Sequence, residues 1–134
     1  MSTQGEVEVS YGVSNDFFKL WLDEKMNYTC ALYEGTDNLE VAQLNKLARL
    51  SKLAGIGSHT ESVLDVGCGW GANLEYQAVV NKVPRVHGFT LSPSQHQYCL
   101  ERDLPNTVAT CENYLHYQAP IKFDAAMSIC AIEH

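Results

Sequence analysis

The apolar positions of the chain follow a helical period in its first third and form short continuous runs further on. A helix capped by Ser14 or Asn15 is predicted first, because four apolar residues recur at helical spacing: Phe17, Phe18, Trp21 and Leu22. A longer helix is predicted from Asp37, with Glu40 placed as in a capping box. Its apolar stripe consists of Leu44, Leu47, Leu50 and Leu53, and it ends at Gly55 and Gly57.

The rest of the chain alternates short apolar runs with helical stretches. Strands are predicted at 63–66, 85–91, 107–111 and 123–129. Helices are predicted at 72–80 and 93–104, the second with Ser92 as its cap, Pro93 at its first position and Gln95 at its third. This alternation predicts right-handed crossovers and a parallel sheet, which is an α/β fold.

Composition narrows the class of protein. A chain of 134 residues with 46% hydrophobic content is typical of one globular domain, and its net charge of −7 argues against nucleic acid as a partner. No stretch is apolar enough to span a bilayer, so at most peripheral membrane contact is expected, and the N-terminus lacks the features of a signal peptide. The five scattered cysteines indicate reduced thiols in a cytoplasmic protein, and the five histidines lack zinc-ligand spacing, so no metal is assigned.

The candidate chemistry centres on the stretch from Val63 to Gly71. An apolar run carries Asp65 near its end, Gly67 and Gly69 precede Gly71 at alternate positions, and a helical pattern follows. Glycines permit positive φ and a close approach to the backbone, a helix start offers N–H groups to an anion, and Asp65 can accept from an ammonium or a hydroxyl. The stretch therefore predicts a nucleoside-cofactor site, and the alternative is an ordinary tight turn between strand and helix.

The spacing D-x-G-x-G-x-G differs from the G-x-G-x-x-G of nicotinamide enzymes. It is similar to the pattern of S-adenosylmethionine (AdoMet) methyltransferases. AdoMet has no pyrophosphate, but its methionine end carries a carboxylate and an ammonium group. A glycine turn beside an acid suits that pair of charges.

Further stretches, in order along nearly the whole chain, carry a more specific resemblance. They are Tyr11-x-x-Ser14-Asn15-Asp16-Phe17-Phe18, Trp21-Leu22-Asp23, Tyr28-Thr29-Cys30-Ala31, Ala42-Gln43, Leu64 to Gly71, Gly88-Phe89-Thr90-Leu91-Ser92-x-x-Gln95 and Ser128-Ile129-x-x-x-Glu133-His134. Together they resemble the family of cyclopropane fatty acid synthases and mycolic acid cyclopropane synthases and methyltransferases.

The resemblance implies a Rossmann-like AdoMet-dependent methyltransferase fold, a parallel sheet with helices on both faces. Residues 1–57 would form an N-terminal helical cap over the cofactor and substrate, and residues 58–134 the first half of the methyltransferase domain. Such a domain has seven strands in the family, whereas four are predicted here, so we expect the chain to be a fragment that is inactive alone. We also expect exposed sheet edge and apolar surface, and therefore poor solubility.

The resemblance also implies the cofactor contacts. Tyr28 and Thr29 would cover the methionine end, and Asn113 and Tyr114 would lie near the adenine. The turn would contribute Asp65, Gly67, Cys68, Gly69, Trp70 and Gly71, and the ribose would be held by Thr90, Leu91, Ser92 and Gln95. No acid follows the second predicted strand, where nucleotide-binding folds usually place the ribose ligand. The Gln95 amide oxygen has two alternative roles, since it can accept from a ribose hydroxyl or close the capping box.

The implied chemistry is attack of an alkene on the methyl group of AdoMet, followed by proton loss that closes a cyclopropane ring. Related members add water or transfer a plain methyl group, and some methylate carbon or nitrogen of small molecules. Bicarbonate serves as the base in the family, in a cradle that would consist here of Cys30, Ile129, Cys130 and Glu133. Without the resemblance, Cys30 would be interpreted as a buried apolar thiol and Glu133 as a surface acid.

Three functions therefore remain open. The first is a methyltransferase of the cyclopropane-fatty-acyl-phospholipid synthase type that acts on an unsaturated acyl lipid. The second is a C- or N-methyltransferase of the same family with a small-molecule acceptor. The third is a non-catalytic cofactor-binding module that works with a partner chain.

Overall fold

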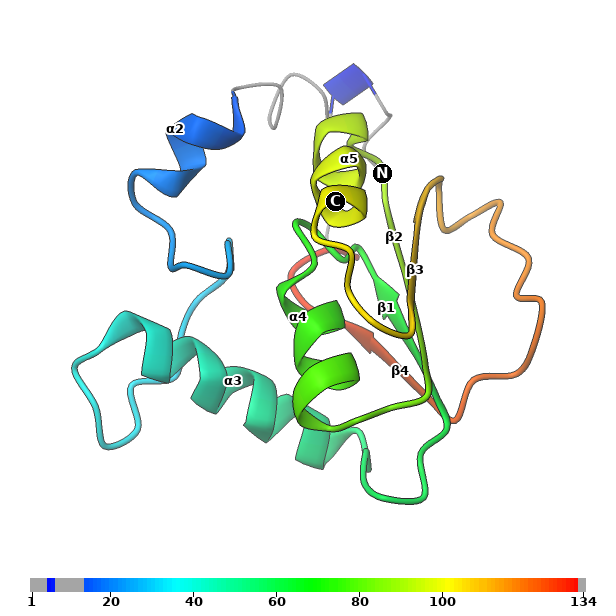
Figure 1. The fold of residues 1–134 in the computed structure, drawn as a ribbon, viewed down its shortest axis with the longest axis horizontal. Helices are drawn as coiled ribbons and strands as arrows, with labels where there is room; N and C mark the ends of the chain where they lie inside the picture. Colours follow the sequence, from blue (N-terminus) through cyan, green and yellow to red (C-terminus); the bar gives the residue numbers. More distant parts are fainter. Residues whose placement is uncertain (1–4, 7–13, 133–134) are drawn as a thin grey trace.

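The computed structural model describes residues 5–6 and 14–132, which form an α/β fold (Figure 1). The helical elements are α2 (Asn15–Lys19), α3 (Leu39–Leu53), α4 (Ala72–Glu75), the π-helical turn η1 (Tyr76–Val80) that continues α4, and α5 (Pro93–Glu101). The strands are β1 (Ser62–Val66), β2 (Arg85–Thr90), β3 (Thr107–Cys111) and β4 (Ala125–Ser128). The predicted strands are thus all present, with bounds that shift by no more than a few residues.

The four strands form one parallel sheet in the order β3-β2-β1-β4. In the register, Val63 of β1 lies between Val86 of β2 and Ala125 of β4. The chain moves from β1 to β2 and β3 in one direction and then returns to place β4 on the other side of β1. This reversal makes a topological switch point between β1 and β4, and such folds bind ligands beyond the carboxyl ends of the strands at that point.

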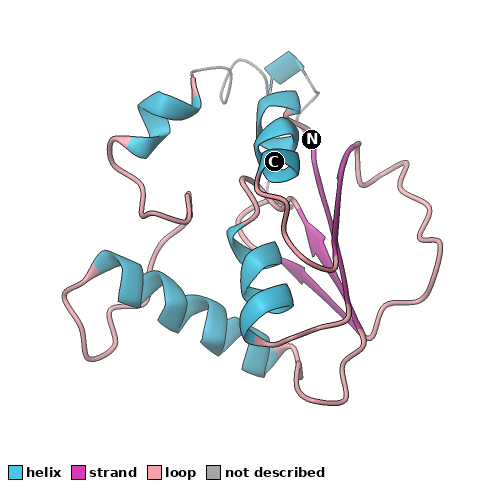
Figure 2. Ribbon diagram, viewed as in Figure 1, coloured by secondary structure: helices cyan, strands magenta, loops and turns pink. Residues whose placement is uncertain are grey.

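One face of the sheet packs against α4, η1 and α5 (Figure 1). Their shared core consists of Val63, Cys68, Leu74, Ala78, Val83, Val86 and Cys99. On the opposite face, Phe89 of β2 packs on Tyr117 with 4.9 Å between ring centroids, and His87 contacts the same ring. Tyr117 belongs to the long loop between β3 and β4, which Figure 2 shows on the far side of the strands from these helices.

A second, aromatic cluster joins the first helix to the glycine turn. Phe18 of α2, Met26 and Trp70 are each at most 3% exposed, and the rings of Phe18 and Trp70 lie 4.8 Å apart. The indole Nε1 of Trp70 donates to Asn15 Oδ1 at 2.8 Å. Residues from α2 therefore anchor the N-terminal segment on the turn that follows β1.

The first helix is shorter than predicted and buries fewer of its apolar residues. The helix ends at Lys19, and of the four predicted core residues Phe18 is fully buried while Phe17 and Trp21 are about half exposed. Ser14 occupies the cap position without a side-chain cap bond, and Asn15 instead accepts from Trp70. A helix of this length has one buried position because it meets the rest of the molecule through one cluster.

The longer helix also differs from its prediction. Asn38, not Asp37, caps α3, since its side chain accepts from Val41 N at 2.9 Å. The predicted leucine stripe is wrong at Leu44 and Leu53, which are 46% and 71% exposed. Leu47 is buried as predicted, and the rest of the buried face consists of Ala42, Gln43, Lys46 and Ser51. This face turns toward polar partners, among them Gln77, whose Nε2 donates to Ser51 Oγ at 2.8 Å.

The helix after the glycine turn has the predicted extent but widens from α to π geometry at Tyr76. Gln77, which is fully buried, sits in this widened turn and bonds to Ser51 and Asn73. Helix α5 ends at Glu101, three residues before the predicted end at Leu104. Among the described residues, no helix combines the length and the apolar character that crossing a bilayer would require.

Candidate functional site

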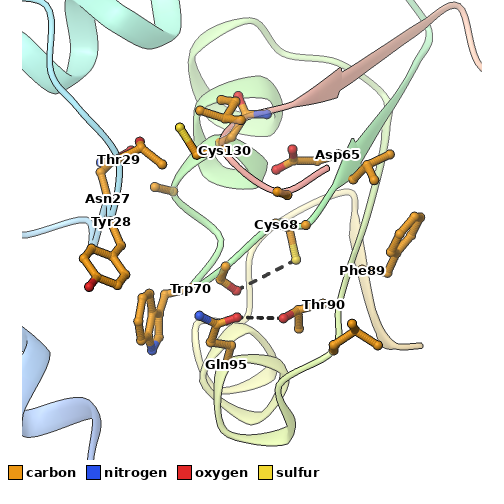
Figure 3. Close-up of a pocket in the computed structure, with 18 of the residues that line it drawn as sticks. Asn27, Tyr28, Thr29, Asp65, Cys68, Trp70, Phe89, Thr90, Gln95 and Cys130 are labelled. Carbon is orange, nitrogen blue, oxygen red and sulfur yellow. Dashed lines mark hydrogen bonds between the residues drawn. The ribbon is translucent and has the colours of Figure 1, made fainter. Parts of the chain in front are cut away.

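A cavity opens at the switch point, beyond the carboxyl ends of all four strands (Figure 3). Asp65 comes from β1, Thr90 from β2, Asn113 follows β3, and Ile129 follows β4. The segment from Met26 to Thr29 and Lys46 of α3 line the side contributed by the first third of the chain. The fold thus brings six separate stretches of sequence to one cavity.

The glycine turn forms one wall of the cavity, and side chains would not fit at two of its glycines. Gly67 has φ +78°, and a Cβ added to it would lie 2.2 Å from the Cβ of Ala131 after β4. Gly71 has φ +85°, and its added Cβ would lie 3.1 Å from the Cys99 sulfur. The N–H groups of Gly67 and of the next residue both donate to Phe89 O, at 3.0 and 2.9 Å. Two glycines are therefore required here by positive φ together with close packing.

Asp65 is the buried acid of this wall. It is 2% exposed, and its Oδ2 has no hydrogen-bond partner among the described residues. Burial raises the pKa of Asp65 to about 7, although a hydrogen bond from Asn73 and the charge of Lys46 favour the ionised form. A buried carboxyl oxygen without a partner destabilises a fold, so a ligand that supplies a cation or a donor fits this position.

The segment after β2 is held by its own side chains. Thr90 Oγ1 donates to Gln95 Oε1 at 2.6 Å and accepts from Ser92 N at 3.1 Å (Figure 3). Ser92 Oγ caps α5 by accepting from Gln95 N at 3.3 Å. Gln95 therefore does not close a capping box directly, because Thr90 stands between its amide oxygen and the Ser92 N–H. The amide nitrogen of Gln95 lies on the Trp70 side of the cavity in Figure 3.

The structure brings most of the predicted site residues to this cavity. Lining it are Tyr28, Thr29, Asp65, Gly67, Cys68, Gly69, Trp70, Thr90, Leu91, Gln95, Asn113, Tyr114, Ile129 and Cys130. Two others support the wall from behind: Gly71 is the cap position of α4, and Ser92 is the cap of α5. These positions place the residues at the cavity, and the cofactor contact expected of each one stays a prediction.

The predicted base cradle is brought together in part. Ile129 and Cys130 line the cavity, and Cys130 has φ +52°, a strained conformation for a residue other than glycine. Cys30 lines an adjoining depression with Trp21 and is exposed, unlike the buried thiol expected in the absence of the resemblance. Glu133 lies outside the described residues.

Cys68 and Cys99 meet beneath the glycine turn. Their sulfurs approach the carbonyl oxygen of Gly69, at 3.9 and 3.4 Å respectively. Interaction with Cys99 and burial raise the pKa of the Cys68 thiol, and the same contact lowers the pKa of Cys99. Cys68 is therefore a neutral thiol that packs the turn against α5.

Sequence reasoning missed four polar residues of the cavity: Asn27, Lys46, Asn73 and Glu112. Lys46 is 7% exposed, and the available signal was its place beside Leu47 and three residues after Gln43, which together form the buried side of α3. Glu112 follows β3, so the cavity contains a second acid besides Asp65, although neither follows β2 as the ribose rule requires.

The sheet order, the glycine turn and the cavity beyond the strands define a Rossmann-like fold of the AdoMet-dependent methyltransferase class. The chain belongs to one family within that class, because the family model described as mycolic acid cyclopropane synthetase matches residues 2–134. Cyclopropane mycolic acid synthase 2 of Mycobacterium bovis is 36% identical over 138 residues, an alignment that covers 96% of this chain and 43% of that protein.

Solved structures agree with this assignment. The mycolic acid cyclopropane synthase CmaA1 complexed with SAH and CTAB matches with a TM-score of 0.88 and 31% identity, over 99% of this chain and 47% of that one. Coclaurine N-methyltransferase bound to N-methylheliamine and SAH matches with a TM-score of 0.78 and 26% identity, over 87% of this chain and 35% of that one. The chain thus spans less than half the length of these relatives.

Proposed function

We propose that this chain provides the AdoMet-binding part of a methyltransferase of the cyclopropane-fatty-acyl-phospholipid synthase type. The acceptor is the double bond of an unsaturated acyl chain, to which a methyl or methylene group is transferred. The observation that carries the proposal is the cavity at the switch point, where a turn with positive φ at Gly67, Gly69 and Gly71 meets the unpartnered buried oxygen of Asp65. Membership of the mycolic acid cyclopropane synthase family supports it.

The residues present fit AdoMet. Asp65 offers an open acceptor to the ammonium group of the methionine end, and the glycine turn admits a ligand close to the backbone. Gln95 offers amide N–H donors on the side where the ribose is expected, with Asn113 and Tyr114 further along the cavity for the adenine. When bound, AdoMet supplies an electrophilic methyl group to the acceptor.

The remaining residues would handle the acceptor and its proton. Ile129 and Cys130 line the cavity beside Asp65, and Cys30 lies in the adjoining depression. This arrangement is compatible with the bicarbonate cradle that the resemblance implies, with Glu133 as its fourth member. The apolar side chains of Leu47 and Phe89 line the same cavity and help to exclude water from it.

Calorimetric titration of the chain with AdoMet and with S-adenosylhomocysteine (SAH) tests the cofactor part of the proposal. We expect both to bind, and we expect Asp65→Ala to weaken both about tenfold or more, because a charge-assisted hydrogen bond is lost. A variant at an exposed acid, Glu101→Ala, serves as the control and should bind as the wild type does. Absence of AdoMet and SAH binding to the folded wild type would refute the cofactor assignment.

The acceptor is tested by mass spectrometry of products formed from AdoMet and phospholipids with unsaturated acyl chains. A gain of one CH2 unit on the lipid supports the proposal. The second candidate is a C- or N-methyltransferase of small molecules, favoured by the similarity to coclaurine N-methyltransferase. A CH2 gain on a small amine, with the lipid unchanged, would favour this second candidate instead.

A further inference from the structure

Lys46 is a buried cation that the proposed function does not use. It lies on α3, is 7% exposed and lines the cavity. Its ammonium nitrogen lies 2.5 Å from Thr29 Oγ1 and 3.2 Å from Asn27 Oδ1. A lysine is seldom buried to this degree without a partner that needs its charge or its donors.

The hydrogen-bond donors and acceptors around Lys46 can be assigned in only one way. An ammonium group only donates, so Thr29 Oγ1 must accept from it, and the Thr29 hydroxyl proton is left to donate to another acceptor. Asn27 likewise accepts through Oδ1, and its Nδ2 donates to Asp23 Oδ2 at 2.8 Å. Lys46 therefore makes Thr29 a donor on the wall of the cavity.

The same part of the chain is held firmly in place. Gln43, one turn before Lys46 on α3, donates through Nε2 to Thr29 O at 2.9 Å. Asn27 N donates to Asp23 Oδ1 at 2.6 Å, and Asp23 is itself 3% exposed. The Thr29 hydroxyl is thus presented from a segment that α3 fixes at two points.

The two polar sides of the cavity differ in charge. One side carries Lys46 and the Thr29 donor, and the other carries the unpartnered acceptor oxygen of Asp65. Burial lowers the pKa of Lys46, while the negative charge of Asp23 counteracts that effect. A ligand that carries a carboxylate and an ammonium on the same carbon complements this arrangement, because each of its charges then meets the opposite one.

We propose that Lys46 is a positioning residue that acts through Thr29 and makes this wall of the cavity a binding site for the carboxylate of an α-amino acid group. The inference rests on the proposed function, in which that group is the methionine end of AdoMet, with its ammonium at Asp65. It adds to that function a residue that selects for the amino-acid end of the ligand and leaves recognition of the adenosine to other residues.

The test compares two ligands that share the thioadenosine part. SAH carries the amino-acid end, whereas 5′-methylthioadenosine lacks it. We expect Lys46→Met to weaken SAH binding about tenfold or more, the equivalent of one charge-assisted hydrogen bond, and to leave 5′-methylthioadenosine within about twofold. Lys46→Arg keeps the charge and the donors and should restore most of the SAH affinity. Lys52→Met, an exposed lysine of the same helix, is the matched control and should change neither affinity.

An equal loss of affinity for both ligands in Lys46→Met would mean a purely structural role and would overturn the inference, as would an unchanged SAH affinity. If Lys46→Met fails to fold, as judged by circular dichroism, Thr29→Val decides instead, because it removes the hydroxyl and keeps the shape. It should show the same selective loss of SAH affinity, and an equal loss for both ligands or none would overturn the inference. A wild type that binds neither ligand would refute the proposed function and the inference together, and a wild type that binds both isolates the role of Lys46.

Discussion

At the scale of residues, a few buried polar side chains are the main indication of a ligand-binding site in this molecule. Asp65 and Gln43 each have a buried oxygen without a partner among the described residues, and Lys46 is buried with both of its partners on the cavity side. Unpartnered buried polar atoms destabilise a fold, so the open oxygen of Asp65 in the wall of the cavity indicates that ligand binding compensates for it, whereas Gln43 lies outside the cavity lining.

The pH dependence of stability tests the environment of Asp65. Its pKa in the folded chain is about 7, above the ordinary value of 3.8, so the folded state binds the proton more tightly than the unfolded state does. The stability that this proton contributes is fully present below about pH 4 and is lost as the pH rises through about 7. Without ligand, the wild type should therefore lose up to about 1.4 kcal/mol per pH unit across this window relative to Asp65→Asn.

Urea unfolding of both proteins at pH 5 and pH 8 measures this difference. Other carboxyl groups titrate in both proteins and cancel in the comparison. Equal losses of stability in the wild type and in Asp65→Asn would show that the carboxyl group is not protonated in the folded chain at pH 5.

At the scale of elements, α3 both packs against the cavity and binds a neighbouring polar segment. The apolar pattern of its sequence does not show which residues do which. Leu47 packs toward the cavity, while Gln43 and Lys46 bind the segment from Asn27 to Thr29. Its apparent leucine stripe is partly on the surface, because the element that it meets is a polar loop rather than a flat apolar sheet. Which residues of such a helix are buried therefore depends on the elements that it packs against.

The start of α3 provides a test at this scale. Asn38→Ala should lower the free energy of unfolding by about 1 kcal/mol, because the side-chain bond to Val41 N is lost. Asp37→Ala should change it by less than about 0.5 kcal/mol, since Asp37 is an exposed residue outside the cap. Thermal or urea unfolding of both variants measures the two values, and a larger effect at Asp37 would restore the capping box predicted from the sequence.

At the scale of the whole molecule, the sheet has β3 and β4 as its edges within the described residues. Large apolar side chains are exposed near these edges and on the N-terminal segment, among them Leu20 at 81%, Val108 at 56% and Ile132 at 66%. Open parallel edges with apolar neighbours favour pairing between chains.

We therefore expect this chain in isolation to self-associate in a concentration-dependent way. Light scattering coupled to size-exclusion chromatography measures the mass across a dilution series, and bound SAH should reduce the association if it orders the cavity. A monomer that melts in one sharp two-state transition at every concentration would contradict the expectation.

The sequence by itself determined the class of the fold and the place of the site. Its apolar runs predicted all four strands, and the glycine spacing after Asp65 predicted the turn that forms the cavity wall. These features are local, since strand periodicity and the backbone freedom of glycine act over a few residues. The family resemblance also rests on short local motifs, and most of the residues that it indicated line the cavity.

The tertiary structure alone decided which polar residues became buried and what they face. Lys46 and Asn27 belong to the cavity because α3 packs across the segment before it. Asp65 is buried because β1 lies between β2 and β4, and one of its oxygens is left without a partner. Burial and hydrogen-bond polarity depend on contacts between residues far apart in the chain. Burial and hydrogen-bond partners therefore cannot be derived from helical periodicity or motif spacing, and they are observed only in the packed structure.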